Sequence, residues 1–398
     1  MSEMSYLEKL LDGVEVEWKT LGSIAELKRG TSITKKDVID GTIPVVAGGR
    51  TPAYYHNTSN RDGQTIVIAG SGAYAGFVSW WEEPIFVSDA FTVKPHNILL
   101  PRYCYHFLMN MQQQLHDFKS GGGVPHVYPR DVSPILIPIP CPDNPERSLA
   151  IQSEIVRILD KFTALTAELT AELTMRKKQY NYYRDQLLSF DDDEVEWKTL
   201  GEIGTWHGGG TPSKSRSEFW EDGSIPWISP KDMGRPIVDT SEDYITEEAV
   251  EQSSTKLVPA NSIAIVVRSS ILDKVMPSAL IPVPATFNQD MKVVIPHCNI
   301  SPNYIAHIMR SRGDDILRAA KKSGGSVASI DSKKLFSFRI PVPHLNEQKR
   351  IVNILDKFDT LANSITEGLP REIELRQKQY EYYRDLLFSF PKPEATSN

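Results

Sequence analysis

Two segments of this 398-residue chain are each written twice, in the same order. EVEWKTLGSI at 15–24 returns as EVEWKTLGEI at 194–203, and RKKQYNYYRDQLLSF at 176–190 returns as RQKQYEYYRDLLFSF at 376–390. The stretches between them differ, so the chain alternates repeated and divergent parts. A tandem duplication of this kind restricts the fold to two copies of one arrangement.

The second repeated segment belongs to a longer stretch with helical periodicity. IVRILDKF at 155–162 returns as IVNILDKF at 351–358, and a proline-rich run, LIPIPCP or RIPVPHL, precedes each copy. We expect these prolines to end a strand before a helix begins. In the first copy, a series of residues that are apolar or aromatic except for Arg176 alternates spacings of three and four, which indicates a coiled-coil seam. The seam comprises Ile151, Ile155, Ile158, Phe162, Leu165, Leu169, Leu173, Arg176, Tyr180, Tyr183 and Leu187.

The tandem TAELTAEL interrupts that rhythm as a four-residue stutter. A helix from Ser148 to Leu188 would be on the order of 60 Å long at about 1.5 Å per residue. One four-residue unit corresponds to about 6 Å, so the helix is interpreted as a spacer whose length such units adjust. The second copy contains Gly368 and Pro370, which predict a break or kink.

The divergent stretches, 25–135 and 204–338, align loosely through DGTIPV with DGSIPW and SDAFTVKP with NQDMKVVIP. Short β-branched runs predict buried strands, and other segments have helical spacing. The runs are TIVIAG (65–70), SIAIVVR (262–268) and MKVVIP (291–296). We therefore expect an α+β chain: two mixed α/β domains, joined and separated by two long antiparallel coiled-coil helices, in a pseudo-two-fold tandem repeat shaped like a dumbbell. The predicted boundaries are 1–147 for an N-terminal segment with the first domain, 148–190 for the central helix, 191–345 for the second domain, 346–390 for the C-terminal helix and 391–398 for a tail.

Composition limits the functions that such a chain can have. The net charge of −7 argues against a protein that coats nucleic acid indiscriminately, so any nucleic-acid contact must be local. No run approaches 18 apolar residues and the N-terminus lacks a basic and then apolar leader, so neither a membrane span nor a secretion signal is expected. Three widely separated cysteines suggest no zinc knuckle or disulfide framework and fit a reducing cytoplasm.

The duplication itself suggests a mode of action. Parts that stay alike can bind the same partner twice, whereas parts that diverge can bind two different targets. Duplex DNA is the target that best suits two surfaces held at a fixed distance about a dyad. Each domain would then read one short sequence and leave unread base pairs between.

The repeated motifs resemble the specificity subunit of bacterial type I restriction-modification enzymes. The resemblance rests on EWKTLGEI, the IPIP or IPVP run before IVxILDKF, the pair Glu347 and Gln348, and RxKQYxYYRD, and it covers essentially the whole chain. The first copy departs from this pattern, because DNPERSLAIQSEIV lacks the adjacent Glu-Gln pair. The resemblance implies a non-catalytic subunit with two target recognition domains that binds double-stranded DNA, two methyltransferase subunits and, in the full complex, ATP-driven restriction subunits. It also implies adenine N6 methylation, with S-adenosylmethionine, ATP and Mg in the partner subunits and no cofactor in this chain.

DNA contacts are predicted where basic side chains cluster around glycine-rich loops at corresponding places in the two halves. KSGGGVPHVYPRD at 119–131 corresponds to KKSGGSVASIDSKK at 321–334, whose glycines allow close approach to phosphate. Arginine pairs with guanine and amides pair with adenine, so loop arginines are candidate base readers. The candidates are Lys28, Arg29, Lys35, Lys36, Arg50, Lys119, His126 and Arg130 in the first half, and Lys214, Arg216, Lys231, Arg268, Arg310, Arg312, Lys321, Lys322, Lys333 and Lys334 in the second.

Partner contacts are predicted on the repeated helices, where one tyrosine of each pair continues the seam and its neighbour must point elsewhere. The candidates are Tyr180, Tyr182, Tyr183, Arg184, Glu347, Gln348, Tyr380, Tyr382, Tyr383 and Arg384.

Other chemistries find weaker support. GGGTPSKS at 208–215 fails the phosphate-loop pattern, and no helix pattern or spaced acid follows GSGAYAG at 70–76. The nine histidines have no metal-ligand spacing and are interpreted as surface or satisfied imidazoles. Two alternatives stay open: a coiled-coil scaffold that binds two proteins and no DNA, and an autonomous DNA-modifying enzyme, for which no catalytic or cofactor motif is found.

Overall fold

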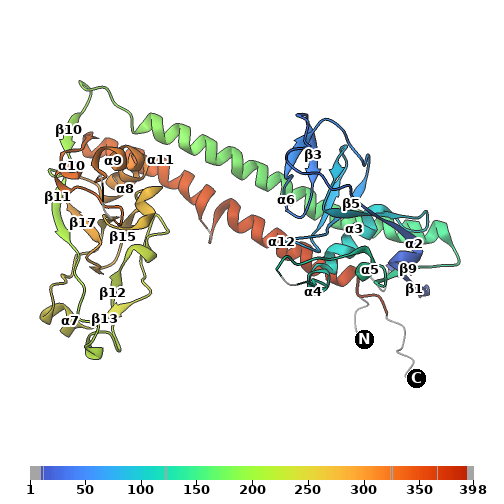
Figure 1. Ribbon diagram of the computed structural model, residues 1–398. Helices are drawn as coiled ribbons and strands as arrows, with labels where there is room; N and C mark the ends of the chain where they lie inside the picture. The colour runs from blue at the N-terminus through green and yellow to red at the C-terminus, as the bar shows by residue number, and fades with distance from the viewer. Residues whose placement is uncertain are drawn as a thin grey trace. The chain divides into compact units, whose positions relative to one another are not determined.

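The computed structural model describes residues 10–391 except 12, 122, 323, 325 and 365, and the chain divides into two compact units (Figure 1). Among the described residues, unit 1 comprises 10–170 and 372–391, and unit 2 comprises 171–322, 324, 326–364 and 366–371. The predicted tail lies outside the described residues except for Pro391. No helix in the described part of the chain is long and apolar enough to cross a membrane.

Unit 1 contains a four-stranded antiparallel sheet in the order β2-β8-β5-β6 and a three-stranded sheet in the order β4-β3-β7. A ribbon of β1 and β9 precedes the long helix. The strands are β1 (Val16–Thr20), β2 (Ala25–Arg29), β3 (Ile43–Val46), β4 (Tyr54–His56), β5 (Thr65–Ala69), β6 (Val78–Trp81), β7 (Phe86–Val87), β8 (Ala90–Pro95) and β9 (Leu136–Pro140). The helices are α2 (Leu21–Ile24), α3 (Pro101–Asn110), α4 (Gln112–Asp117) and α5 (Pro129–Val132).

Unit 2 repeats this topology with sheets in the orders β11-β17-β14-β15 and β13-β12-β16 and a ribbon of β10 and β18. The strands are β10 (Glu196–Thr199), β11 (Gly204–Gly208), β12 (Ile225–Ile228), β13 (Tyr244–Ile245), β14 (Ser262–Val266), β15 (Ser278–Ile281), β16 (Thr286–Phe287), β17 (Met291–Pro296) and β18 (Arg339–Val342). The helices are α7 (Glu247–Gln252), α8 (Pro302–Ser311), α9 (Gly313–Ala320) and α10 (Ser332–Ser337), with 3-10 turns η1 (Ser217–Phe219), η2 (Pro230–Asp232) and η3 (Ser270–Asp273). The prediction of two versions of one fold is confirmed.

The three β-branched runs form β5, β14 and β17, and every residue of β5 and β14 is buried. Each proline-rich run ends a ribbon strand before a helix, as predicted. Matching registers pair Trp18 with Pro138 and Trp197 with Pro341. The hydroxyls of Tyr103 and Tyr304, on α3 and α8, donate to the carbonyls of these two prolines at 3.0 Å. The same hydrogen bond therefore ties a helix to the ribbon in each unit.

Helix α6 (Pro145–Leu187) is continuous over 43 residues, close to the predicted 148–188. The second copy is interrupted, because α11 (Leu345–Asn363) ends before α12 (Gly368–Leu387) begins. Gly368 has φ +78°, and a Cβ there would lie 2.5 Å from the carbonyl oxygen of Thr360. The predicted break is confirmed, and glycine is the residue that both its backbone angle and its surroundings require.

Each unit completes its core with the end of a helix from the other sequence repeat. Leu387, Phe388 and Phe390 belong to the buried core of unit 1, whereas Leu188 belongs to that of unit 2. Two aromatic pairs also join a helix of one sequence repeat to a helix of the other. Phe162 stacks on Tyr383 with ring centroids 5.1 Å apart, and Tyr183 stacks on Phe358 with ring centroids 5.6 Å apart. The structural units are therefore not the two sequence repeats, since each takes its last helical turns from the other copy.

Candidate nucleic-acid interface

Two loops meet at one end of the four-stranded sheet in each unit. In unit 1, the backbone N–H of Gly72 donates to Pro125 O at 2.9 Å and that of Val127 donates to Gly70 O at 3.0 Å. In unit 2, Ser269 donates to Ala328 O at 3.0 Å and Ile330 donates to Val267 O at 2.9 Å. We call these paired loops the clasp: residues 70–72 with 125–127, and residues 267–269 with 328–330. The clasp includes parts of the glycine-rich loops that the sequence marked for DNA contact.

Beside the clasp of unit 1 lies a hollow of about 610 Å³, lined in part by Arg29, Ser71, Asp89, His126 and Tyr128. The Tyr128 ring stacks on His126 at 5.8 Å between centroids. The guanidinium groups of Arg29 and Arg130 lie 5.1 and 4.7 Å from the same ring. Three predicted DNA contacts thus gather around one aromatic side chain that sequence reasoning did not select.

The other first-half candidates lie on or near these loops. Arg50 lies over the ring of Tyr74 at 4.9 Å, and the ammonium of Lys119 donates to Ala73 O at 2.9 Å, so both contact the loop after β5. Lys28 is exposed on β2, the strand that ends at Arg29. Exposed Lys35 and Lys36 follow in the next loop, and no hydrogen bond or ion pair joins them to the clasp among the described residues.

In unit 2 several candidates gather at the clasp. Arg268 belongs to it and lies 3.5 Å from Asp290, and Lys321 lies 2.8 Å from Asp273. Lys333 and Lys334 are exposed in the first turn of α10, where Asp331 accepts hydrogen bonds from both of their backbone N–H groups. Lys214, Lys322, Lys333 and Lys334 make no ion pair with any described residue. These four ammonium groups are available to an external anion.

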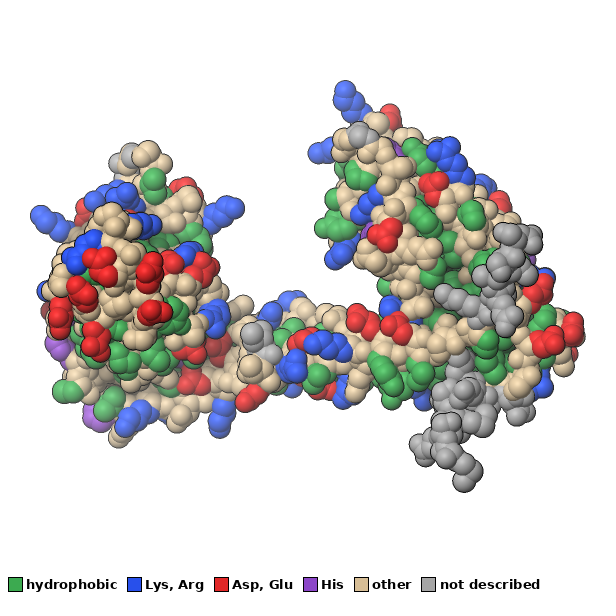
Figure 2. All heavy atoms as spheres, turned by 90° about the horizontal axis from the view of Figure 1, so that it is seen from below, with side chains coloured by type: hydrophobic (Ala, Val, Ile, Leu, Met, Phe, Trp, Pro, Cys, Tyr) green, Lys and Arg blue, Asp and Glu red, His purple; other side chains and the backbone are tan. Residues whose placement is uncertain are grey.

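On the face drawn in Figure 2, Lys and Arg side chains are interspersed with Asp and Glu on both units. A broad basic surface is not seen there. This mixture agrees with the net charge of −7 and with contacts confined to a few loops.

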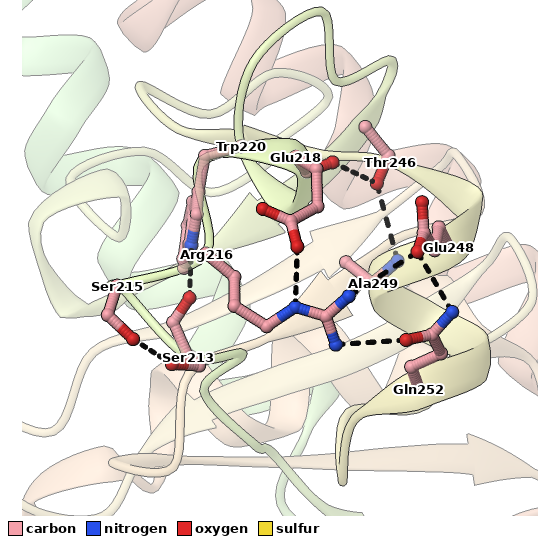
Figure 3. A network of polar contacts seen from close by, with 9 residues as sticks. All are labelled: Ser213, Ser215, Arg216, Glu218, Trp220, Thr246, Glu248, Ala249 and Gln252. Atoms are coloured by element: carbon pink, nitrogen blue, oxygen red, sulfur yellow. Dashed lines mark hydrogen bonds and ion pairs between the residues drawn. The ribbon is translucent and has the colours of Figure 1, made fainter.

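Four predicted DNA contacts instead have intramolecular partners. The Arg216 guanidinium donates to Glu218 at 2.7 Å and to Gln252 at 2.9 Å, and it holds the pKa of the Glu218 carboxyl below its usual range (Figure 3). Lys231 lies 2.7 Å from Glu242 and 3.0 Å from Asp243. Arg310 lies 3.2 Å from Asp359, and Arg312 lies 3.5 Å from Asp315. These four groups are paired with acids, as Arg268 and Lys321 also are, and their role in DNA contact stays a prediction.

Two buried histidines join the divergent domains to the repeated helices. His106 on α3 lies 2.7 Å from Asp160 through Nε2 and 3.0 Å from the Tyr380 hydroxyl through Nδ1. Burial lowers the pKa of His106, so the neutral ring donates to Asp160 and accepts from Tyr380. His307 on α8 likewise lies 2.7 Å from Asp356 and accepts from Arg310 at 2.9 Å. For these two histidines, the interpretation as satisfied imidazoles is correct.

Gln348 corrects a predicted partner contact, because its side chain is internal rather than displayed. It is 1% exposed, accepts from Ser301 N at 2.8 Å and donates to Pro343 O at 2.8 Å. Gln152 is its equivalent, since each glutamine stands three positions before the repeated IVxILDKF motif. Gln152 is fully buried, accepts from Leu100 N at 2.8 Å and donates to Ile98 O at 3.0 Å. The first copy therefore lacks only the glutamate, and aligning the two motifs would have shown it.

Replacing Gln348 by alanine is expected to lower the free energy of unfolding by about 2–3 kcal/mol, because a buried N–H and a buried carbonyl lose their partner. Gln152→Ala should have the same effect in unit 1. The neighbouring exposed residue supplies a control, Lys349→Ala, expected within about 0.5 kcal/mol of wild type. Urea titration followed by tryptophan fluorescence measures the difference. Equal midpoints for Gln348→Ala and Lys349→Ala would refute the internal role.

The remaining partner candidates differ in exposure. Tyr182 and Tyr382 are 59% and 65% exposed, and each packs edge-on against the tyrosine that follows it in the sequence. Those following tyrosines, Tyr183 and Tyr383, stack on Phe358 and Phe162. Tyr180 and Tyr380 are instead largely buried. Glu347 pairs with Arg350 at 2.6 Å, Arg184 with Asp185 at 2.8 Å, and Arg384 with Asp385 at 2.9 Å. The two outward tyrosines are the side chains of this set that the structure leaves most open to a partner.

Comparison with known proteins agrees with this arrangement. The family model described as type I restriction modification DNA specificity domain matches residues 13–175 and 192–375. The chain is 63% identical to the specificity subunit of the type I restriction enzyme EcoR124I/EcoR124II from Escherichia coli, with all of both chains covered. A putative type I restriction enzyme specificity subunit from Haemophilus influenzae is 31% identical, over 97% of this chain and 98% of its own. The crystal structure of a type I restriction-modification S subunit from M. genitalium has the same fold, with a TM-score of 0.62 at 18% identity over 98% of this chain and 100% of that chain.

Proposed function

Because the chain belongs to the family of type I restriction-modification DNA specificity subunits, we propose that it selects a two-part sequence in duplex DNA for a restriction-modification complex. The observation that carries this function is the clasp, which occurs twice on one topology with different side chains at matching positions. The same backbone arrangement with different side chains would let the two units contact DNA in the same way and recognise different bases. We call the two separate parts of such a DNA target half-sites. Lys322, Lys333 and Lys334, near the clasp of unit 2, supply phosphate contacts.

The repeated helices would then set the separation of the half-sites. We propose that α6 pairs antiparallel with the C-terminal helices as a coiled-coil spacer, which agrees with the aromatic stacking of Phe162 on Tyr383 and of Tyr183 on Phe358. Two methyltransferase subunits would dock on repeated surfaces that include Tyr182 and Tyr382. Restriction subunits would join the full complex.

Catalysis belongs to the partner subunits in this proposal. The chain itself is non-catalytic and holds no cofactor, whereas S-adenosylmethionine, ATP and Mg bind to the methyltransferase and restriction subunits. The site of action is the cytoplasm, where host DNA is accessible.

Selection from a random duplex pool tests this function against the scaffold alternative. The complex of this chain with its methyltransferase subunit is purified and mixed with duplexes carrying a random central region, and the bound fraction is sequenced. Enrichment of two short motifs with a fixed gap is expected. A stable complex that enriches no sequence would favour the scaffold.

A further inference from the structure

An aspartate occupies the same place beside the clasp in both units. In unit 1, Gly70 N donates to Asp89 O at 2.9 Å, and in unit 2 Val267 N donates to Asp290 O at 2.9 Å. Asp89 directly precedes β8, in SDAFTV, and Asp290 directly precedes the equivalent strand β17, in NQDMKV. The residues on either side differ, so the acid stays while its surroundings change.

Each aspartate is accompanied by an arginine, but the two arginines come from different elements. In unit 2, Nε of Arg268 lies 3.5 Å from Oδ1 of Asp290, an atom that is buried and accepts no hydrogen bond from the described residues. Unit 1 has Ser71 at the clasp position of Arg268, and its arginine is Arg29, which lines the same hollow as Asp89. Arg268 thus contacts Asp290 directly in unit 2, whereas Arg29 and Asp89 face the same hollow in unit 1.

Folding alone does not require such a pair. The Arg268 side chain is 63% exposed and that of Asp290 is 25% exposed. Because the Arg268 side chain is largely solvated, an ion pair of this kind contributes little to the stability of the fold. Retention of the combination in two otherwise different loops therefore indicates a role in binding.

The chemistry of the pair matches one base pair. Guanine presents the acceptors O6 and N7 in the major groove, which an arginine binds with two parallel N–H groups. Cytosine presents the N4 amine, a donor that a carboxylate accepts. A carboxylate held near Nε of Arg268 leaves the terminal guanidinium nitrogens for guanine and orients the planar group.

We propose that Arg29 with Asp89, and Arg268 with Asp290, each read one G·C base pair, one in each half-site. This inference rests on the proposed function of the chain. It adds which side chains discriminate and which base pair they select.

The test compares variants in the complex with the methyltransferase subunit, using single-molecule sequencing of methylated adenines in the host genome. Arg268→Ala is expected to relax one G·C position of one half-site, with discrimination lost on the order of 10- to 100-fold, while the other half-site and the gap stay unchanged. Arg29→Ala should relax one G·C position in the other half-site. Asp290→Asn should weaken discrimination at the position that Arg268→Ala relaxes.

Arg268→Lys covers the case in which the alanine variant fails to assemble, because lysine keeps the charge but lacks the two-pronged geometry. It should also relax the G·C position. Arg235→Ala is the matched control: it removes an exposed arginine that lies 3.6 Å from Asp239 in the same unit, and it should leave the motif unchanged.

The outcomes separate the two proposals. A wild-type complex without a two-part motif would overturn the proposed function itself. A normal two-part motif that keeps full stringency in Arg29→Ala, Arg268→Ala and Arg268→Lys, or relaxation only at A·T positions, would overturn this inference and leave the proposed function intact.

Discussion

Replacing Gly209 by alanine is expected to lower the free energy of unfolding of unit 2 by about 3 kcal/mol. A Cβ at this position would overlap the carbonyl oxygen of Asn288 and would lie 2.6 Å from that of Phe287. Both obstacles are backbone atoms, so the clash cannot be relieved by a side-chain rotation. Without a side chain at Gly209, the chain leaving β11 can pass close to the backbone of Phe287 and Asn288, at the end of β16.

Gly208, the last residue of β11, provides the control because it directly precedes Gly209 and a Cβ there meets nothing within 4 Å. Gly208→Ala should change stability by less than about 0.5 kcal/mol. Gly30 is the equivalent of Gly209 in unit 1, where a Cβ would overlap the carbonyls of Val87 and Ser88. Thermal unfolding followed by circular dichroism measures all three variants, and equal melting temperatures for Gly208→Ala and Gly209→Ala would contradict the packing described.

Deleting one TAEL unit from residues 166–173 is expected to abolish methylation of the original target and to create a target with a shorter gap. The deletion shortens α6 by about 6 Å, which equals one or two base-pair rises of about 3.4 Å. Four residues also turn a helix by roughly one turn, so the faces of α6 stay nearly aligned. Both half-sites should therefore stay the same.

The control for this deletion is Glu168→Ala, which changes an exposed residue within the repeat and keeps its length. It should leave the gap unaltered. Methylome sequencing reads both variants. An altered half-site with an unaltered gap in the deletion variant would refute the role of α6 as a spacer.

Much of the fold was predictable because it depends on local patterns. The seam spacing predicted α6, Gly368 and Pro370 predicted the interruption of the second copy, and β-branched runs predicted the buried strands. The exchange of helix ends between the repeats was not predicted. A repeat shows which segments are alike, but it does not show which core each segment completes.

For the candidate site, the charges could be read from the sequence, but the partners of those charges could not. Arg216 meets Gln252 across 36 residues and Arg310 meets Asp359 across 49, so both seemed free. Tyr128 was missed because an aromatic residue in a loop has no distinctive spacing. Asp89 and Asp290 were within reach, since SDAFTVKP and NQDMKVVIP had already been aligned.

The most direct test of the central claim is the sequence of methylated adenines in a host that co-expresses this chain with the methyltransferase subunit from the same locus. Single-molecule sequencing should show one new asymmetric motif, made of two short half-sites separated by a fixed number of unread base pairs. A complex that assembles fully and methylates no new motif, or methylates one uninterrupted sequence, would contradict recognition by two separate units.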